Sequence, residues 1–190
     1  MAKKKINISF DNFIYLSEQS LKQILELRNS DEIRYKMANT NIISLEEHLS
    51  FCKKLKGDPT RLYIRISVEN EFLGVLTSVN NDFTNHTYVP GCYFSQSVLS
   101  KYRNLSVDIA SVFSFLCYKL GLFYPMIYVR KDNPRAVFYN TMKLSNKIVK
   151  EDDTYYYMSN NCMDPTKQDD EVILKKFDYL FDKYNMSFNI

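Results

Sequence analysis

Two adjacent segments that alternate apolar and polar residues constrain the fold of this chain most strongly. Arg61 to Val68, RLYIRISV, carries an apolar residue at every second position, and the letters ENE lead into a second apolar segment, Phe72 to Val79. A period of two residues indicates β-strands, and a short polar connection between two strands predicts an antiparallel hairpin. The chain therefore contains at least one antiparallel sheet.

Strands and helices are expected on both sides of this hairpin, and they suggest one α/β domain with a mixed sheet and helices on both faces. Before the hairpin we expect a strand at Ile6 to Phe10 and helices at Leu21 to Arg28, at Asp31 to Met37 and after the capping box Ser44–Glu47. After it we expect a strand at Thr87 to Ser95 that Pro90-Gly91 interrupts with a bulge or a break in the ladder. A helix at Leu105 to Leu120, ended by Gly121, and a strand at Pro125 to Arg130 follow. Next we expect a helix from Asn133 and a hairpin around KEDDT. The chain ends in a helix with one apolar stripe, formed by Ile173, Phe177, Leu180, Phe181 and Tyr184.

Composition excludes several classes of protein. The net charge of the 190 residues is only +3, which argues against nucleic-acid binding, and no apolar run approaches the roughly 20 residues that span a membrane. The four cysteines, Cys52, Cys92, Cys117 and Cys162, are too scattered for a zinc site or a disulfide framework. Reduced thiols, a cytoplasmic location and no bound metal are therefore expected, and cysteine nucleophiles are not.

A basic, glycine-free loop, LSKYRNLS, leads into the longest apolar helix. Ser106 is expected to cap this helix, whose first backbone N–H groups and dipole favour an anion. Lys101 and Arg103 add positive charge, and Asn104 is the non-glycine residue that best tolerates a positive φ at the turn. The loop is either a phosphate site or an ordinary solvated helix entry.

Two side chains on apolar helix faces have a structural and a functional interpretation. Arg28 continues the stripe of its helix, so its guanidinium points inward and needs either an internal carboxylate or a ligand. His48 lies among Leu45, Leu49 and Cys52, where it is either a hydrogen-bonded core residue or part of a site.

The element order, the basic loop and the segment YVRKDNPRAVFY together resemble the GNAT superfamily of CoA-dependent N-acyltransferases. The resemblance implies a mostly antiparallel sheet that splays between its fourth and fifth strands, where backbone amides of a Gln/Arg-x-x-Gly-x-Gly/Ala loop hold the CoA pyrophosphate. Lys101, Asn104 and Ser106 occupy the three defining places of that loop, with Arg103 and Leu105 between them. All three depart from the pattern.

The same resemblance assigns roles to the helix that follows the fifth strand. Asn133 would cap it beside the CoA arm, and Tyr139 would protonate the leaving thiolate. Tyr139 stands one residue before the family's usual tyrosine place, which Asn140 occupies. One residue rotates a side chain by about 100° around a helix, so Tyr139 is either this acid or a tyrosine at the edge of the core.

The segments LRNSDEIRYKM and ISLEEHLSF resemble the branch of the superfamily that acylates amino groups on nucleotide-linked sugars, such as the N-acetyltransferases of the pseudaminic acid pathway. This implies transfer of an acetyl group, or a larger one such as 3-hydroxybutanoyl, from acyl-CoA to a dTDP- or UDP-linked amino sugar in lipopolysaccharide synthesis. The backbone N–H of Tyr93 or Phe94 would stabilise the oxyanion. The expected substrate-binding residues are Arg28, His48, Thr77, Ser78, Tyr93 and Tyr128, and His48 is also expected to be catalytic.

The proton acceptor and the overall assembly stay open. Candidate bases are His48, Glu69, Asp82 and His86, or a water relay. Residues 1–164 are expected to form the acyltransferase domain, and 165–190 a helical extension that covers a sheet edge or mediates a homodimer. The alternative functions are a protein N-terminal acetyltransferase, including the ribosomal type, and a non-catalytic binding module with the same fold.

Overall fold

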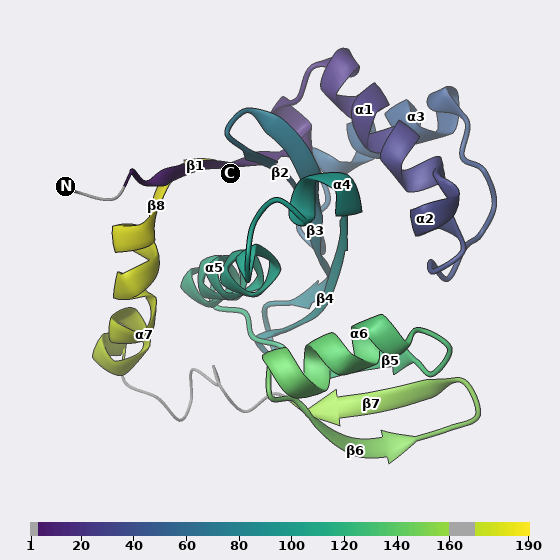
Figure 1. Cartoon of the computed structure of the whole chain (residues 1–190). Helices are drawn as coiled ribbons and strands as arrows, with labels where there is room; N and C mark the ends of the chain where they lie inside the picture. Colours follow the sequence, from purple (N-terminus) through teal and green to yellow (C-terminus); the bar gives the residue numbers. More distant parts are fainter. Residues whose placement is uncertain (1–3, 160–169) are drawn as a thin grey trace.

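The computed structural model describes residues 4–159 and 170–190, which form two sheets (Figure 1). The larger sheet has the strand order β4-β3-β2-β1-β8, and the smaller has the order β5-β7-β6. All pairs are antiparallel except β1 with β8. The strands are β1 (Ile6–Asn12), β2 (Arg61–Val68), β3 (Glu71–Asp82), β4 (Thr87–Phe94), β5 (Met126–Arg130), β6 (Lys147–Glu151), β7 (Tyr155–Ser159) and β8 (Tyr184–Asn189).

Helices cover both faces of the larger sheet, as the sequence predicts. Those before the hairpin gather on one side of it, whereas α5 and α7 lie on the other, and α6 lies against the smaller sheet (Figure 1). The helices are α1 (Glu18–Asn29), α2 (Asp31–Arg34), α3 (Leu45–Leu55), α4 (Gln96–Leu99), α5 (Leu105–Lys119), α6 (Pro134–Phe138) and α7 (Asp170–Lys183), with a 3-10 turn at Phe13–Tyr15 and a π turn at Tyr139–Lys143.

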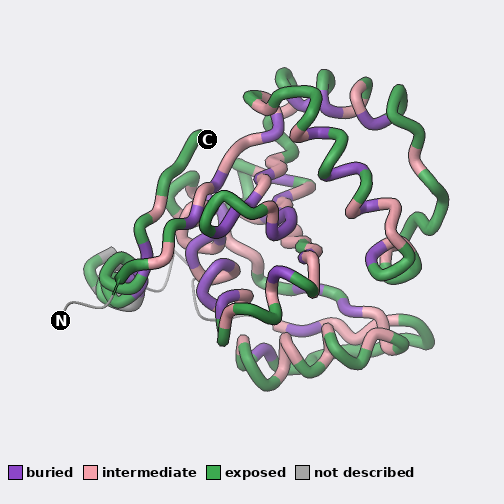
Figure 2. Tube along the Cα trace, turned by 45° about the horizontal axis from the view of Figure 1, so that its top comes forward, coloured by how far each residue is buried: buried purple, intermediate pink, exposed green. Residues whose placement is uncertain are grey.

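The main core lies between the larger sheet and α5. The apolar stripe of α5, including Ile109, Val112 and Phe113, is buried against β2, β3 and β4, and this core reaches α7 through Phe177 and Leu180. Figure 2 shows the buried residues concentrated in the larger sheet and α5, with the hairpin of the smaller sheet mostly half-buried or exposed. The core thus fixes α5 against β4, the strand beside the gap between the sheets.

The two sheets meet at one point and then separate, as expected for strands four and five. The N–H of Tyr88 donates to the Phe123 carbonyl (3.1 Å), and the Phe123 N–H donates to the His86 carbonyl (2.9 Å). Beyond this bridge, β4 is the edge of one sheet and β5 the edge of the other. The side of β4 that faces away from β3 therefore pairs with no described strand beyond this bridge.

The predicted bulge or break at Pro90-Gly91 is wrong. The register between β3 and β4 runs through both residues, with Ser78 opposite Pro90 and Thr77 opposite Gly91, and the irregularity lies near the start of β4 instead. A proline costs no ladder bond on the open side of an edge strand. Pro90 stands where its missing N–H would have pointed into the gap.

The final helix is shorter than expected, because Tyr184 begins a strand. α7 ends at Lys183, and β8 pairs in parallel with β1, with Ile6 opposite Tyr184 and Phe10 opposite Phe188. The rings of Phe10 and Phe188 stack with centroids 5.0 Å apart. The extension therefore covers the β1 edge with a strand rather than a helix, and the side chain of Ile173 lies outside the described residues.

Candidate active site

The N-terminal end of α5 opens beside the gap between the two sheets. Asn104 adopts φ 61° at the N-cap, as predicted, and its side chain makes no capping hydrogen bond. Its carbonyl accepts from the N–H groups of Val107 and Asp108. The N–H groups of Leu105 and Ser106 have no acceptor among the described residues, so they remain available to an anion.

Ser106 is not the cap that the sequence predicts. It is the second residue of the helix, and Asn104 takes the N-cap place because its left-handed backbone makes the turn. Lys101 is also engaged, since its Nζ donates to both carboxylate oxygens of Glu71 at 2.7 and 2.8 Å. Arg103 is exposed and forms no ion pair with a described residue, which leaves it as the loop's free cation.

Tyr139 lies at the end of α6 and extends to the N-terminal end of α5, which we call the mouth of α5. Its hydroxyl donates to the Ser106 carbonyl at 2.8 Å. A π turn begins at Tyr139, closed by a bond from the Leu144 N–H to the Tyr139 carbonyl, so this turn holds one residue more than an α-helical turn. Burial raises the pKa of Tyr139, and the nearby thiol of Cys92 adds to the rise. The phenol is a proton donor at every physiological pH.

The neighbouring residue Asn140, which stands in the family's usual tyrosine place, has a structural role instead. Its side-chain amide donates to the Ala136 carbonyl at 2.9 Å and accepts from Asn146 at 3.2 Å. Asn133 caps α6 as predicted, accepting from the Ala136 N–H at 3.1 Å. These bonds hold the helix that carries Tyr139.

The three described cysteines are free thiols, and none is activated. Burial raises the pKa of Cys52 to about 11, that of Cys92 to about 11 and that of Cys117 to about 12. Cys92 is nevertheless exposed to solvent. Cys92 lies on β4, the edge strand of the larger sheet.

The backbone of β4 offers hydrogen-bond donors to the gap. Successive N–H groups of a strand point to opposite edges. The N–H of Tyr88 points toward β5 and that of Ser95 donates to Leu73 of β3, so the N–H groups of Cys92 and Phe94 face the gap. Of the two predicted oxyanion donors, Phe94 has the right direction, whereas the N–H of Tyr93 points toward β3.

Arg28 is buried with no carboxylate partner among the described residues. Only 8% of it is exposed, and Nη2 donates to the Asn39 carbonyl at 2.7 Å while Nη1 has no partner. Burial lowers the pKa of Arg28, the charge of Arg34 lowers it further, and the Tyr93 phenol opposes the shift. A buried guanidinium lacking a counter-ion is satisfied by an anionic ligand.

Arg34 is a second arginine close to Arg28, and the sequence analysis did not single it out. It donates to the Thr40 carbonyl at 3.0 Å and pairs with Asp31 at 2.6 Å, while its Nε is buried without a partner. Together with Arg28 it holds the loop that follows α2. Its position directly after Ile33 gives no periodic signal, because α2 spans only four residues.

His48 is buried beside Cys52. Its Nε2 lies 3.8 Å from the Cys52 sulfur. Burial lowers the pKa of His48 and the Leu21 backbone acts to raise it, with the net shift downward, so the ring is neutral. These contacts place it between α1 and α3 as a hydrogen-bonded core histidine, the structural alternative of the sequence analysis.

The other candidate bases also have local partners. Glu69 accepts from the Asn7 N–H at 2.8 Å, Asp82 accepts from turn amides that follow it, and His86 bonds to the Gly121 carbonyl at 3.0 Å. The backbone bond from Asn7 lowers the pKa of Glu69. The structure brings none of these groups to the open edge of β4.

The predicted substrate residues divide into two groups. Ser78 is fully buried and donates to Asn81 at 2.5 Å on the α5 side of the sheet, so it is not available to a substrate. Thr77 lies across Gly91, where a Cβ would come within 2.5 Å of its hydroxyl, and therefore faces the other side near the β4 edge. Tyr93 packs on that same side, against the core under α1 and α3.

Tyr128 is exposed on β5 and stands apart from the residues above. Ile127 and Val129 point to the core under α6, so Tyr128 occupies the opposite face of the smaller sheet. Its ring lies 5.6 Å from that of Tyr155 and 6.5 Å from that of Tyr157. These aromatic faces are suited to stacking on a planar or sugar ligand.

The described residues offer neither a metal site nor a membrane-spanning helix. No group of three or more His, Cys, Asp or Glu side chains there could hold a metal ion. Among the same residues, none of the helices combines the length and apolarity needed to cross a bilayer.

Comparison with known proteins decides the family. No family model matches the chain. The chain is 30% identical over 130 residues to the acetyltransferase PseH of Campylobacter jejuni subsp. jejuni serotype O:23/36 (strain 81-176), covering 68% of this chain and 79% of that protein. The chain belongs to the PseH acetyltransferase family.

Solved structures of the PseH family and beyond share the GNAT fold with this chain. The crystal structure of Campylobacter jejuni PseH in complex with acetyl coenzyme A aligns with a TM-score of 0.58 and 24% identity, covering 80% of this chain and 96% of that one. Spermidine N-acetyltransferase from Vibrio cholerae in complex with CoA and spermine aligns with a TM-score of 0.62 and 13% identity, covering 80% and 94%. As a PseH-family protein, the chain is an acyl-CoA-dependent N-acyltransferase with acyl-CoA as its co-substrate.

Proposed function

We propose that this enzyme transfers an acyl group, acetyl by default, from acyl-CoA to the amine of a dTDP- or UDP-linked amino sugar in lipopolysaccharide synthesis. The observation that carries the acceptor is Arg28, a buried cation for which the described residues supply no counter-ion. A nucleotide diphosphate supplies the missing negative charge. The basic tail of a ribosomal protein, the competing acceptor, would be repelled by Arg28.

The donor site in this proposal is the mouth of α5 and the open edge of β4. The free amides of Leu105 and Ser106, with Arg103 beside them, hold the diphosphate of CoA. The N–H of Phe94 stabilises the oxyanion that forms as the amine attacks the thioester carbonyl. Acyl-CoA supplies the activated acyl group, and the attack needs no covalent enzyme intermediate.

In this proposal, Tyr139 gives a proton to the leaving thiolate, and a chain of water molecules takes the proton of the amine. Tyr139 holds its proton through burial and releases it to the departing thiolate near the mouth of α5. Since His48, Glu69, Asp82 and His86 all have local partners, a water relay accepts the proton of the amine. The free thiols and the use of acyl-CoA support a cytoplasmic location.

The direct test is product mass. Purified enzyme is incubated with acetyl-CoA or 3-hydroxybutanoyl-CoA and with either a UDP- or dTDP-linked amino sugar or a peptide bearing a ribosomal-protein N-terminus. We expect an acylated nucleotide sugar and an unchanged peptide. Acylation of the peptide alone would overturn the acceptor, and no acyl transfer with CoA bound would favour the binding module. Transfer of acetyl but not 3-hydroxybutanoyl would exclude the larger group.

A further inference from the structure

The C-terminal extension contacts the first turn of α5, where the donor site begins. Asp108 stands in that turn and is only 6% exposed. Its Oδ2 accepts hydrogen bonds from the Nζ of Lys183 and from the hydroxyl of Tyr184. One carboxylate oxygen of α5 is therefore held by two residues that follow it by 75 and 76 positions in the sequence.

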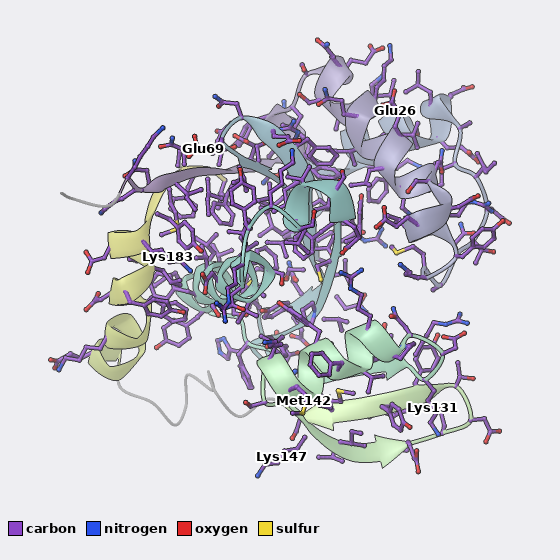
Figure 3. All side chains as sticks on the ribbon, in the orientation of Figure 1. Glu26, Glu69, Lys131, Met142, Lys147 and Lys183 are labelled. Atoms are coloured by element: carbon purple, nitrogen blue, oxygen red, sulfur yellow. The ribbon has the colours of Figure 1, made fainter. Side chains whose placement is uncertain are left out.

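Lys183 and Tyr184 are fixed by the two elements that they join. Lys183 is the last residue of α7, which packs on α5 with the rings of Phe177 and Phe115 4.7 Å apart. Tyr184 is the first residue of β8, which is hydrogen-bonded to β1. Figure 3 shows Lys183 at the end of α7 nearest α5. The junction between helix and strand thus sits on the first turn of α5.

The charge of Lys183 matters because the net positive charge around the mouth of α5 is small. Lys101 is neutralised by Glu71, and Asp108 carries the same sign as a diphosphate. With Lys183 paired to Asp108, Arg103 gives the mouth a net charge of +1. Without Lys183 that net charge is zero.

We propose that Lys183 and Tyr184 are positioning residues for the donor. They hold the Asp108 carboxylate and offset its charge, so that the amides of Leu105 and Ser106 accept the diphosphate of CoA. The extension is then part of the donor site and not only a cover for the β1 edge. This inference rests on the proposed binding of the CoA diphosphate at α5.

Calorimetric titration with CoA tests the charge argument in the full chain. Lys183→Met should raise the Kd for CoA about three- to tenfold, because an offset charge near a helix N-terminus is lost. Lys183→Arg should bind CoA as the wild type does. The matched control is Lys175→Met, which removes the same charge from an exposed position of α7 and should leave the Kd unchanged.

Asp108→Asn separates a charge role from a structural one. If the carboxylate opposes the diphosphate, Asp108→Asn binds CoA as tightly as the wild type or more tightly, and Asp108→Asn combined with Lys183→Met restores the wild-type Kd. Loss of CoA affinity in Asp108→Asn equal to that in Lys183→Met would overturn the proposal, as would an unchanged Kd in Lys183→Met.

A donor without the diphosphate provides the second readout. S-acetylpantetheine ends before the diphosphate, so its kcat/KM should be the same in Lys183→Met as in the wild type. An equal loss with both donors would show a general disturbance and refute the positioning role. Failure of the wild type to bind CoA would instead refute the proposed donor site itself, so the two failures are distinguishable.

Discussion

The hydroxyl of Tyr139 donates a hydrogen bond to the main-chain carbonyl of Ser106 at 2.8 Å. This bond links the helix after β5 to the first turn of α5, across the gap where the two sheets part. It places a half-buried phenol beside the amides proposed to hold the diphosphate. The proposed donor site and the proposed proton donor are therefore joined by one hydrogen bond.

Removing that hydroxyl tests the general acid. Tyr139→Phe should lower kcat about 100-fold, because the thiolate then leaves without a proton, while the KM for acyl-CoA changes less than twofold. Steady-state kinetics at pH 7.5 measure both constants. Tyr156→Phe, which removes a hydroxyl from β7 of the smaller sheet, is the control and should keep wild-type kcat. An unchanged kcat in Tyr139→Phe would show that Tyr139 is not the general acid.

Arg28 should set the affinity for the anionic part of the acceptor. Arg28→Met removes the unpartnered guanidinium and should weaken inhibition by free UDP or dTDP at least about tenfold, with little effect on CoA binding. Lys22→Met removes a charge from the exposed side of the same helix and serves as the control. Equal inhibition of Arg28→Met and wild type would contradict a nucleotide site at this arginine.

The left-handed backbone of Asn104 predicts an order among its variants. Asn104→Ala should destabilise the fold by about 1 kcal/mol, because a Cβ-bearing residue resists φ 61°. Asn104→Gly should keep both stability and the Kd for CoA, since the side chain makes no cap bond. Asn70→Ala, at φ 66° in the β2–β3 turn, should lose stability without changing CoA binding. Urea unfolding and CoA titration give the two measurements.

The buried, neutral His48 predicts acid sensitivity. Its pKa is lowered in the folded state, so the unfolded chain binds the proton more readily and stability falls as pH drops below the unfolded value of about 6.5. The Tm should therefore fall between pH 7.5 and pH 5.5. His48→Gln should flatten this slope, whereas His86→Asn at the exposed histidine should not. A slope that survives His48→Gln would assign it to other groups.

Local patterns predicted most of the fold and part of the site. Alternation in RLYIRISV gave the hairpin, and residue type alone gave the left-handed Asn104. Arg28 was predicted to point inward because it continues an apolar stripe. Whether it meets a carboxylate depends on residues distant in the sequence. Only the structure could therefore show that no carboxylate in residues 4–159 or among the described side chains of 170–190 pairs with it.

The failures have physical causes of the same kind. Tyr184 fits a helical stripe and a strand equally well, and only pairing with β1 decides between them. Pro90 suggests a break unless the strand is known to be an edge. Ser78 lies on the buried face of β3. A one-residue change of register would have placed it on the opposite face, and the sequence alone does not fix that register.

A crystal structure of the enzyme with CoA tests the central claim most directly. We expect the diphosphate within hydrogen-bond distance of the Leu105 and Ser106 amides, with Arg103 beside it. The thiol of CoA should lie between Phe94 and Tyr139. A diphosphate bound away from the α5 mouth, or a thiol outside the gap between β4 and β5, would contradict the central claim.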